Sequence, residues 1–119
     1  MSRDYCDHLI DLLAPWDVVS VRRMFGGYGV YRQGLIFGLV IEDVLYFKAD
    51  EMNRPDYEAQ GCEPFTYEAK GKRISIMYWQ VPECALEEPE MLGEWAEKSY
   101  QASIRAQQKK PAKKKPAKV

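Results

Sequence analysis

The chain has 119 residues, of which 46% are hydrophobic and 29% are charged, which is the composition of an ordinary globular domain with a core of its own. Its longest apolar run, Leu35 to Ile41, is far shorter than the roughly 20 residues that a membrane-spanning helix needs. The polar N-terminus does not resemble a secretory signal peptide, and the scattered Cys6, Cys62 and Cys84 fit neither a disulfide framework nor a zinc site. We therefore expect no membrane contact and a reducing cytoplasmic location.

The charge is divided unevenly along the chain. Residues 109–119 contain six lysines and no acid: Lys109, Lys110, Lys113, Lys114, Lys115 and Lys118. Removing these six from the 17 basic residues leaves 11 against 18 acidic residues, so residues 1–108 carry a net charge of −7. We predict an acidic domain over residues 1–108, followed over residues 109–119 by a basic Lys/Pro/Ala tail that is disordered because it has no apolar surface to bury.

The first half of the chain predicts one helix and a meander. Ser2 can cap a helix whose apolar residues recur at helical spacing, and Pro15 ends it. Residues 18–24, 28–32, 35–41 and 44–48 then form three or four short strands. Gln33-Gly34 and Glu42-Asp43 supply the two-residue links of an antiparallel meander.

The second half predicts a helix, a hairpin and a long final helix. The short helix covers residues 50–60, with Pro55 in its first turn and Gly61 after its end. The hairpin joins residues 65–69 and 74–81, and the last helix runs from near Pro89 to about Gln108. We therefore predict an α+β fold with an antiparallel sheet of five to six strands and three helices, in the order α-β(3-4)-α-β(2)-α.

A glycine-rich motif lies between the first two predicted strands. It consists of Arg22, Arg23, Met24, Phe25, Gly26, Gly27 and Gly29. A dinucleotide fingerprint that starts at Gly27 would need a third glycine where Arg32 stands, and a strand follows where a phosphate-binding helix should. We therefore expect no nucleotide cofactor, and a structural role in which Gly26-Gly27 supplies positive φ in a turn or bulge.

The motif, written RRMFGGYGVY, and the apolar strand after it resemble the signature of the N-terminal domain of the TfoX/Sxy family. Residues 44–50, 76–83 and the helix around Trp95-Ala96 follow in the order of that family, so the resemblance covers about residues 5 to 106. It implies a fold of helix, three strands, helix, two strands, helix, similar to that of secretion chaperones. It also implies a role like that of bacterial regulators of natural competence genes, which are thought to act with the cyclic-AMP receptor protein. Full-length regulators of this kind carry a second, C-terminal helical domain, which we expect this chain to lack.

No pattern in the sequence assembles a catalytic or metal site. The sole histidine, His8, lies on the first helix, and no sequence motif pairs it with a nucleophile. The three cysteines suit core or boundary positions. An acidic cluster near the last helix is typical of a solvated helix start, where negative charge is favourable. Its members are Glu83, Glu87, Glu88, Glu90 and Glu94. We predict a protein that is not an enzyme and has no catalytic, cofactor or metal residues.

Two kinds of partner remain open. The tail lysines can contact nucleic acid without reading its sequence, or the tail can serve only to solubilise the domain. Alternation along the strand places Arg22 and Arg23 on opposite faces, so at most one adds to a phosphate-binding surface.

The second kind of partner is another protein. Three helices are too few for both faces of the sheet, which predicts an exposed patch at Met77 and Trp79 for a homodimer or a transcription regulator. If one helix packs on each face instead, no patch is left. The sequence thus predicts a regulatory or adaptor domain, or a dimeric, chaperone-like interaction module without a nucleic-acid role.

Overall fold

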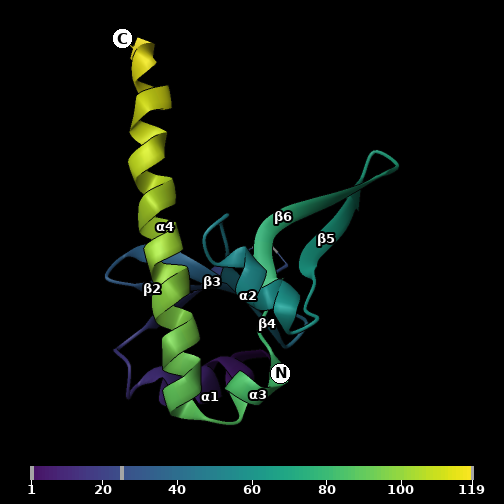
Figure 1. The fold of residues 1–119 in the computed structure, drawn as a ribbon, viewed down its shortest axis with the longest axis vertical. Coiled ribbons are helices and arrows are strands. Elements are labelled where there is room, and N and C mark those ends of the chain that lie inside the picture. The colour runs from purple at the N-terminus through teal and green to yellow at the C-terminus, as the bar shows by residue number, and fades with distance from the viewer. Residues whose placement is uncertain (1, 25, 119) are drawn as a thin grey trace.

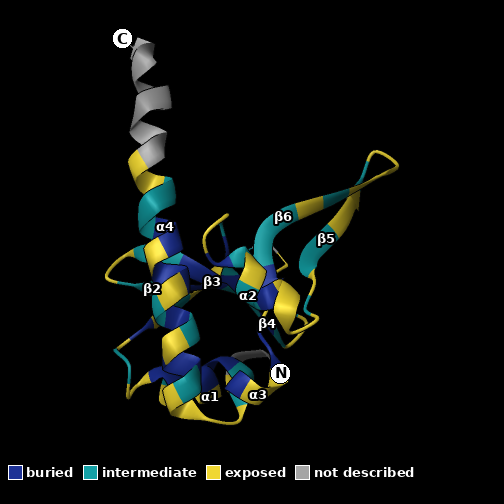
Figure 2. Cartoon of the chain, viewed as in Figure 1, coloured by how far each residue is buried: buried dark blue, intermediate teal, exposed yellow. Residues whose placement is uncertain are grey.

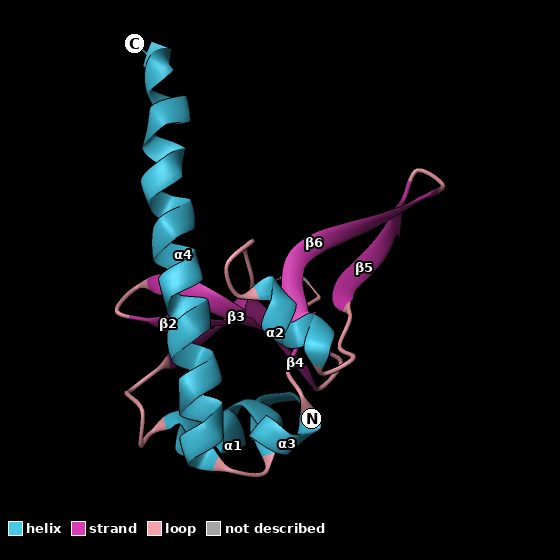
Figure 3. Ribbon diagram, in the orientation of Figure 1, coloured by secondary structure: helices cyan, strands magenta, loops and turns pink. Residues whose placement is uncertain are grey.

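The computed structural model describes the backbone of residues 2–24 and 26–118, and the side chains of residues 4–24 and 26–108. Four helices and six strands form one α+β unit, as Figures 1 and 3 show. The helices are α1 (Ser2–Leu13), α2 (Arg54–Ala59), α3 (Glu83–Leu86) and α4 (Pro89–Lys118). The strands are β1 (Ser20–Met24), β2 (Gly27–Arg32), β3 (Leu35–Ile41), β4 (Val44–Lys48), β5 (Pro64–Ala69) and β6 (Lys72–Gln80). The predicted fold class is confirmed.

The six strands form one antiparallel sheet in the order β1-β2-β3-β4-β6-β5. Tight two-residue turns make the meander, as predicted. Gln33 and Gly34 have φ of 52° and 81°, and Glu42 and Asp43 have φ of 51° and 62°. Positive φ at both central residues matches the right-handed twist of the flanking strands. The β5–β6 hairpin bends away from the rest of the sheet, so the sheet is strongly curled (Figure 1).

A β-bulge in β3 decides which side chains enter the core. Val30 pairs with Gly38 and Tyr31 with Ile36, so Phe37 is an extra residue between them. Strict alternation would put Phe37 on the same face as Leu39. The bulge moves it to the other face, where it is fully buried against the helices.

The helices all pack on one face of the sheet. α4 lies over β3 and β4, α1 packs beside α4, and α2 contacts β6. Buried strand residues such as Leu45 and Phe47 join one core with Leu9 of α1 and Leu92 of α4, and Figure 2 shows this buried layer between sheet and helices. The residues between them on the strands, such as Tyr46, stay partly exposed on the opposite face. Among the described residues, no helix covers that opposite face.

Two sequence predictions need correction. The chain has four described helices and not three, because Pro82 begins a single turn, α3, which is too short to give a periodic signal. The last helix starts at Pro89 as predicted, but its backbone continues to Lys118 and does not end near Gln108. The side chains of residues 109–119 lie outside the described part of the chain, so the nucleic-acid contact expected there stays a prediction.

None of the helices in residues 2–24 and 26–118 combines the length and the apolar character that a membrane crossing requires.

Candidate functional site: an apolar trough on the helix-free face

The glycine motif shapes the end of the β1–β2 hairpin. Gly26 has φ of +82°, a conformation in which a residue with a side chain would be strained. This confirms for one of the two glycines the predicted role of supplying positive φ. Gly27 acts differently: a Cβ built there would lie 2.1 Å from the carbonyl oxygen of Val40. The backbone of β2 therefore approaches β3 more closely than any side chain allows. Phe25, between Met24 and Gly26, lies outside the described residues.

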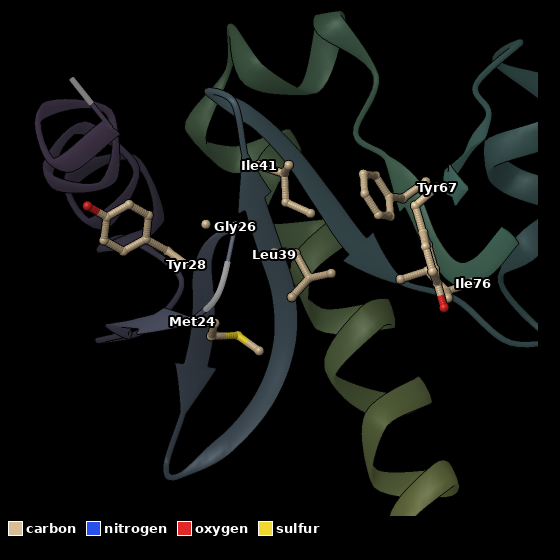
Figure 4. Close-up of a pocket in the computed structure, with 9 residues that line it drawn as sticks. Met24, Gly26, Tyr28, Leu39, Ile41, Tyr67 and Ile76 are labelled. Atoms are coloured by element: carbon tan, nitrogen blue, oxygen red, sulfur yellow. The ribbon is translucent and has the colours of Figure 1, made fainter. Parts of the chain in front are cut away.

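This close approach forms one wall of a trough on the helix-free face. The trough has a volume of about 480 Å³, within the usual range for sites that bury small molecules or anchoring side chains. Its lining residues are Met24, Gly26, Gly27, Tyr28, Leu39, Ile41, Phe65, Tyr67 and Ile76. In Figure 4, Met24 and Gly26 form one side, Leu39 and Ile41 the floor, and Tyr67 and Ile76 the other side. The Tyr28 ring points away from Leu39, so Tyr28 adds little of its side chain.

Aromatic rings from distant segments meet along this face. The rings of Tyr46 and Phe65 are 5.2 Å apart in an edge-to-face arrangement, and Phe65 stacks on Tyr67 at 6.2 Å. Because β4 and the β5–β6 hairpin are far apart in the sequence, these contacts exist only once the sheet has curled. They hold the far wall of the trough in place.

Two cations lie over tyrosine rings on the same face. The Arg22 guanidinium is 4.9 Å from the centre of the Tyr31 ring, and the Lys48 ammonium is 5.1 Å from that of Tyr78. Burial, with a smaller effect from Tyr31, raises the pKa of Tyr78 to about 12. The Tyr78 hydroxyl is therefore neutral at physiological pH, and the charge of this part of the face is positive.

Charge separates between sheet and helices. The strands carry six cations against one acid, Glu68: Arg22, Arg23, Arg32, Lys48, Lys72 and Arg73. Over residues 2–108 the helices carry the acids Asp4, Asp7, Asp11, Asp56, Glu58, Glu83, Glu90, Glu94 and Glu97, and the cations Arg3, Arg54, Lys98 and Arg105. The acidic domain thus has a basic sheet and an acidic helical layer.

Ion pairs use much of the positive charge on the helix side. Lys98 Nζ lies 3.0 Å from Asp56 Oδ2, and Arg105 donates two hydrogen bonds to Asp50 at 2.6 and 2.9 Å. The hydrogen bonds from Arg105 hold the pKa of the Asp50 carboxyl below its usual value. These contacts tie α4 to α2 and to the end of β4, so they serve the fold.

Met77 and Trp79, which we predicted to be exposed for protein interaction, lie on the helix side of β6. Trp79 is only 8% exposed, with its ring 6.3 Å from that of Tyr57, and Met77 packs against the same core. They face the helices because Trp79 pairs with Phe47, a core residue. The exposed patch exists, but it contains Ile76 and its neighbours on the other face of the strand. The alternation of side chains along β6 already indicated that Ile76 and Met77 lie on opposite faces of the strand.

The other predicted positions are dispersed over the molecule. Arg22 pairs with Gly29 and Arg23 with Tyr28, so the two arginines take opposite faces, as predicted. His8 is exposed on α1, Cys6 is buried in the core, Cys62 is half-buried and Cys84 is exposed. The acids of the predicted solvated cluster are all exposed around α3 and the start of α4. Over the described residues, no group of three or more His, Cys, Asp or Glu side chains is placed to hold a metal ion.

Fold and site together define a class: a small α+β domain with one antiparallel sheet, whose helices cover one face and leave an apolar trough on the other. Comparison with known proteins gives the family. A family model described as the TfoX N-terminal domain matches residues 11–103, and the chain belongs to this family.

A curated relative has a name that refers to DNA transformation. This protein, DNA transformation protein TfoX1 of Aliivibrio fischeri (strain ATCC 700601 / ES114), is 31% identical over 71 residues. The match covers 60% of this chain and 34% of the relative, so the chain spans about a third of the length of this curated relative.

Proposed function

We propose that this chain is a non-enzymatic regulatory or adaptor domain related to competence, and that it binds another protein through the helix-free face of its sheet. The partner is a transcription regulator or a second copy of the chain. We further propose a cytoplasmic location and sequence-independent contact between nucleic acid and the lysines of residues 109–119. The family and the name of the A. fischeri relative support the link to DNA transformation.

One observation carries the proposal: the apolar trough on a face that no described helix covers. Its floor and walls are large apolar side chains that stay partly in water, although the same sheet has a well-packed core on its other side. Exposed apolar surface of this kind costs free energy, and it is typical of protein-interaction sites. Among the described residues, the lining offers no carboxylate, histidine, cysteine or lysine, which favours binding over catalysis.

The test measures DNA and protein binding by fluorescence anisotropy with a labelled duplex. The full chain is compared with a full-length variant in which the six lysines of residues 109–119 are replaced by glutamine, each with and without the cyclic-AMP receptor protein. We expect DNA affinity that falls with salt at a log–log slope no steeper than about −5, from roughly 0.9 per neutralised phosphate, and that disappears in the variant.

The receptor protein separates the two versions of the function. If the chain changes receptor occupancy on DNA, and the variant still binds the receptor, the domain is an adaptor with a nucleic-acid contact. If neither the full chain nor the lysine variant binds DNA, and the chain dimerises in sedimentation, then the chain is the dimeric interaction module without a nucleic-acid role. Absence of DNA binding, receptor binding and self-association together would overturn the proposed function.

A further inference from the structure

We propose that the trough binds an acidic peptide segment with large apolar side chains, supplied by a partner protein. This inference rests on the proposed function, because it names the chemistry of the partner for the same surface. It combines two independent properties of the helix-free face, its apolar cavity and its positive charge.

The cavity requires apolar anchors. The described residues that line it include no charged side chain, and Leu39, Ile41 and Ile76 present aliphatic groups that are half-buried. Such a surface gains most from aliphatic or aromatic side chains that remove it from water. The trough is bounded by two hairpins and floored by β3, so its occupant is held on three sides (Figure 4).

The surroundings of the cavity require negative charge. Arg22 and Lys48 lie on this face over tyrosine rings, and the β5–β6 hairpin carries Lys70 and Lys72 near its tip, whereas Arg73 pairs with Glu68 on the other face. Glu68 is the one acid in any of the described strands. A basic surface on an otherwise acidic domain steers acidic partners to one side of the molecule.

Of the two acids nearest to the floor in the chain, Glu42 borders this face and Asp43 lies near α1. Asp43, in the β3–β4 turn, lies close enough to Tyr5 of α1 to help raise the pKa of Tyr5, after the larger effect of burial. Glu42 acts in the same way on Tyr46, where burial is again the larger cause. One acid thus borders the face that bears Arg22 and Lys48.

A peptide fits better than the other occupants. Single-stranded nucleic acid stacks its bases on several exposed aromatic rings, but Tyr46 and Phe65 pack edge to face, the floor is aliphatic, and only Tyr67 of these three rings is exposed. A second copy in a symmetric dimer would bring two basic faces together, and like charges oppose this contact. An acidic, apolar segment meets both requirements.

The experiment begins with selection of random dodecapeptides by display against the full chain. We expect the enriched peptides to be rich in Asp or Glu and to carry at least two large apolar residues. The strongest peptide is then made with a fluorescent label, together with a version in which its acids are amides and a version in which its apolar residues are serine. Both altered peptides should bind more weakly than the original.

Variants of the protein locate the binding site. Leu39→Ser and Tyr67→Ser should each weaken peptide binding about tenfold or more, whereas Met52→Ser, at a 71% exposed apolar position away from the trough, should not. Replacing Arg22 and Lys48 by glutamine should weaken binding at low salt and change little at high salt. Arg23→Gln, at an exposed cation on the other face of β1, is the matched control for Arg22→Gln alone. Circular dichroism and thermal unfolding confirm that each variant is folded.

Several results would overturn the inference. If the enriched peptides are neutral or basic and still depend on Leu39, the chemistry is wrong but the interaction function stands. If Leu39→Ser and Tyr67→Ser bind the peptide normally, the trough is not the site. If an oligothymidylate displaces the peptide and binds less well to the trough variants, the occupant is a nucleic acid. Each result is independent of the receptor-protein assay that tests the proposed function.

Discussion

The two faces of the sheet use the same kind of residue for different purposes. On the helix side, Phe37 contacts Trp16, Phe47 and Tyr100 at ring distances of 5.4 to 6.0 Å and is fully buried. On the other side, Leu39 of the same strand forms the floor of an open trough. Hydrophobicity alone does not distinguish the two positions, since β3 is apolar throughout. The difference arises from where the helices pack.

Cations differ between the faces in the same way. Arg32, on the helix side, is held between the rings of Trp16 and Tyr100 at 4.9 and 4.6 Å and donates a hydrogen bond to Asp17. Arg22, on the trough side, lies over Tyr31 and is exposed. A cation fixed by two rings and a carboxylate is part of the structure, whereas an exposed cation beside an apolar cavity remains available to a partner.

The largest contrast is expected within β3 itself. Phe37→Ala should lower the free energy of unfolding by about 3–5 kcal/mol, because it leaves a cavity among aromatic rings in the core. Leu39→Ala should cost only about 1 kcal/mol, because its side chain is already partly in water. Urea unfolding followed by circular dichroism measures both. Equal losses would mean that the trough is as well packed as the core and that the two faces do not differ.

The second contrast separates the two glycines of the motif. Gly27→Ala should destabilise the protein by about 2–3 kcal/mol, because the new Cβ meets the backbone of Val40 and the hairpin must shift. Gly26→Ala should cost about 1–2 kcal/mol, since no atom lies within 4 Å of its Cβ position and only the positive φ is strained. The same urea experiment compares them. A larger loss at Gly26 would show that the turn, and not the close strand approach, is the main purpose of the motif.

Local pattern predicted most of the fold. Periodicity located α1, the meander, the second hairpin and the start of α4, because each is long enough or has a distinct turn. α3 was missed because one turn has no period. The backbone course of α4 beyond Gln108 was missed because the Lys/Pro/Ala composition suggested disorder.

The trough itself could not be placed from the sequence. The pattern did predict a residual apolar patch, but it did not indicate which face of β6 meets the helices. The prediction therefore placed Met77 and Trp79 in the exposed patch, whereas the structure places Ile76 there. The bulge at Phe37 likewise breaks the alternation that would have assigned the faces of β3. Both depend on long-range packing, and so does the contact of Tyr46 with Phe65.

The third prediction concerns the ion pair that fixes α4 to the segment between β4 and α2. Asp50 has a lowered pKa because Arg105 donates hydrogen bonds to its carboxylate. The Asp50 carboxylate therefore becomes protonated at a lower pH in the native state than in the unfolded state. The ion pair contributes its full stability to the native state above the unfolded pKa of Asp50, which is about 3.9, and this stability is lost as pH falls through the native pKa.

Asp50→Asn should therefore cost about 1 kcal/mol near neutral pH and flatten the fall of unfolding free energy below about pH 4. Urea unfolding across the acidic range measures both effects. Arg105→Gln should flatten the curve similarly, because it removes the same interaction from the other partner. An unchanged slope in both variants would show that this pair does not link α4 to the segment after β4 in solution.

The smallest effect on stability is expected at the rim of the trough. Tyr67 is 44% exposed and stacks on Phe65, so Tyr67→Ser should change the free energy of unfolding by no more than about 0.5 kcal/mol. The same change should reduce binding of an apolar fluorescent dye, because it removes one wall of the cavity. Met52→Ser, also at an exposed apolar position, should leave dye binding unchanged. If Tyr67→Ser unfolds the protein as readily as Phe37→Ala, the β5–β6 hairpin is held by a second core, and the trough serves stability and not a partner.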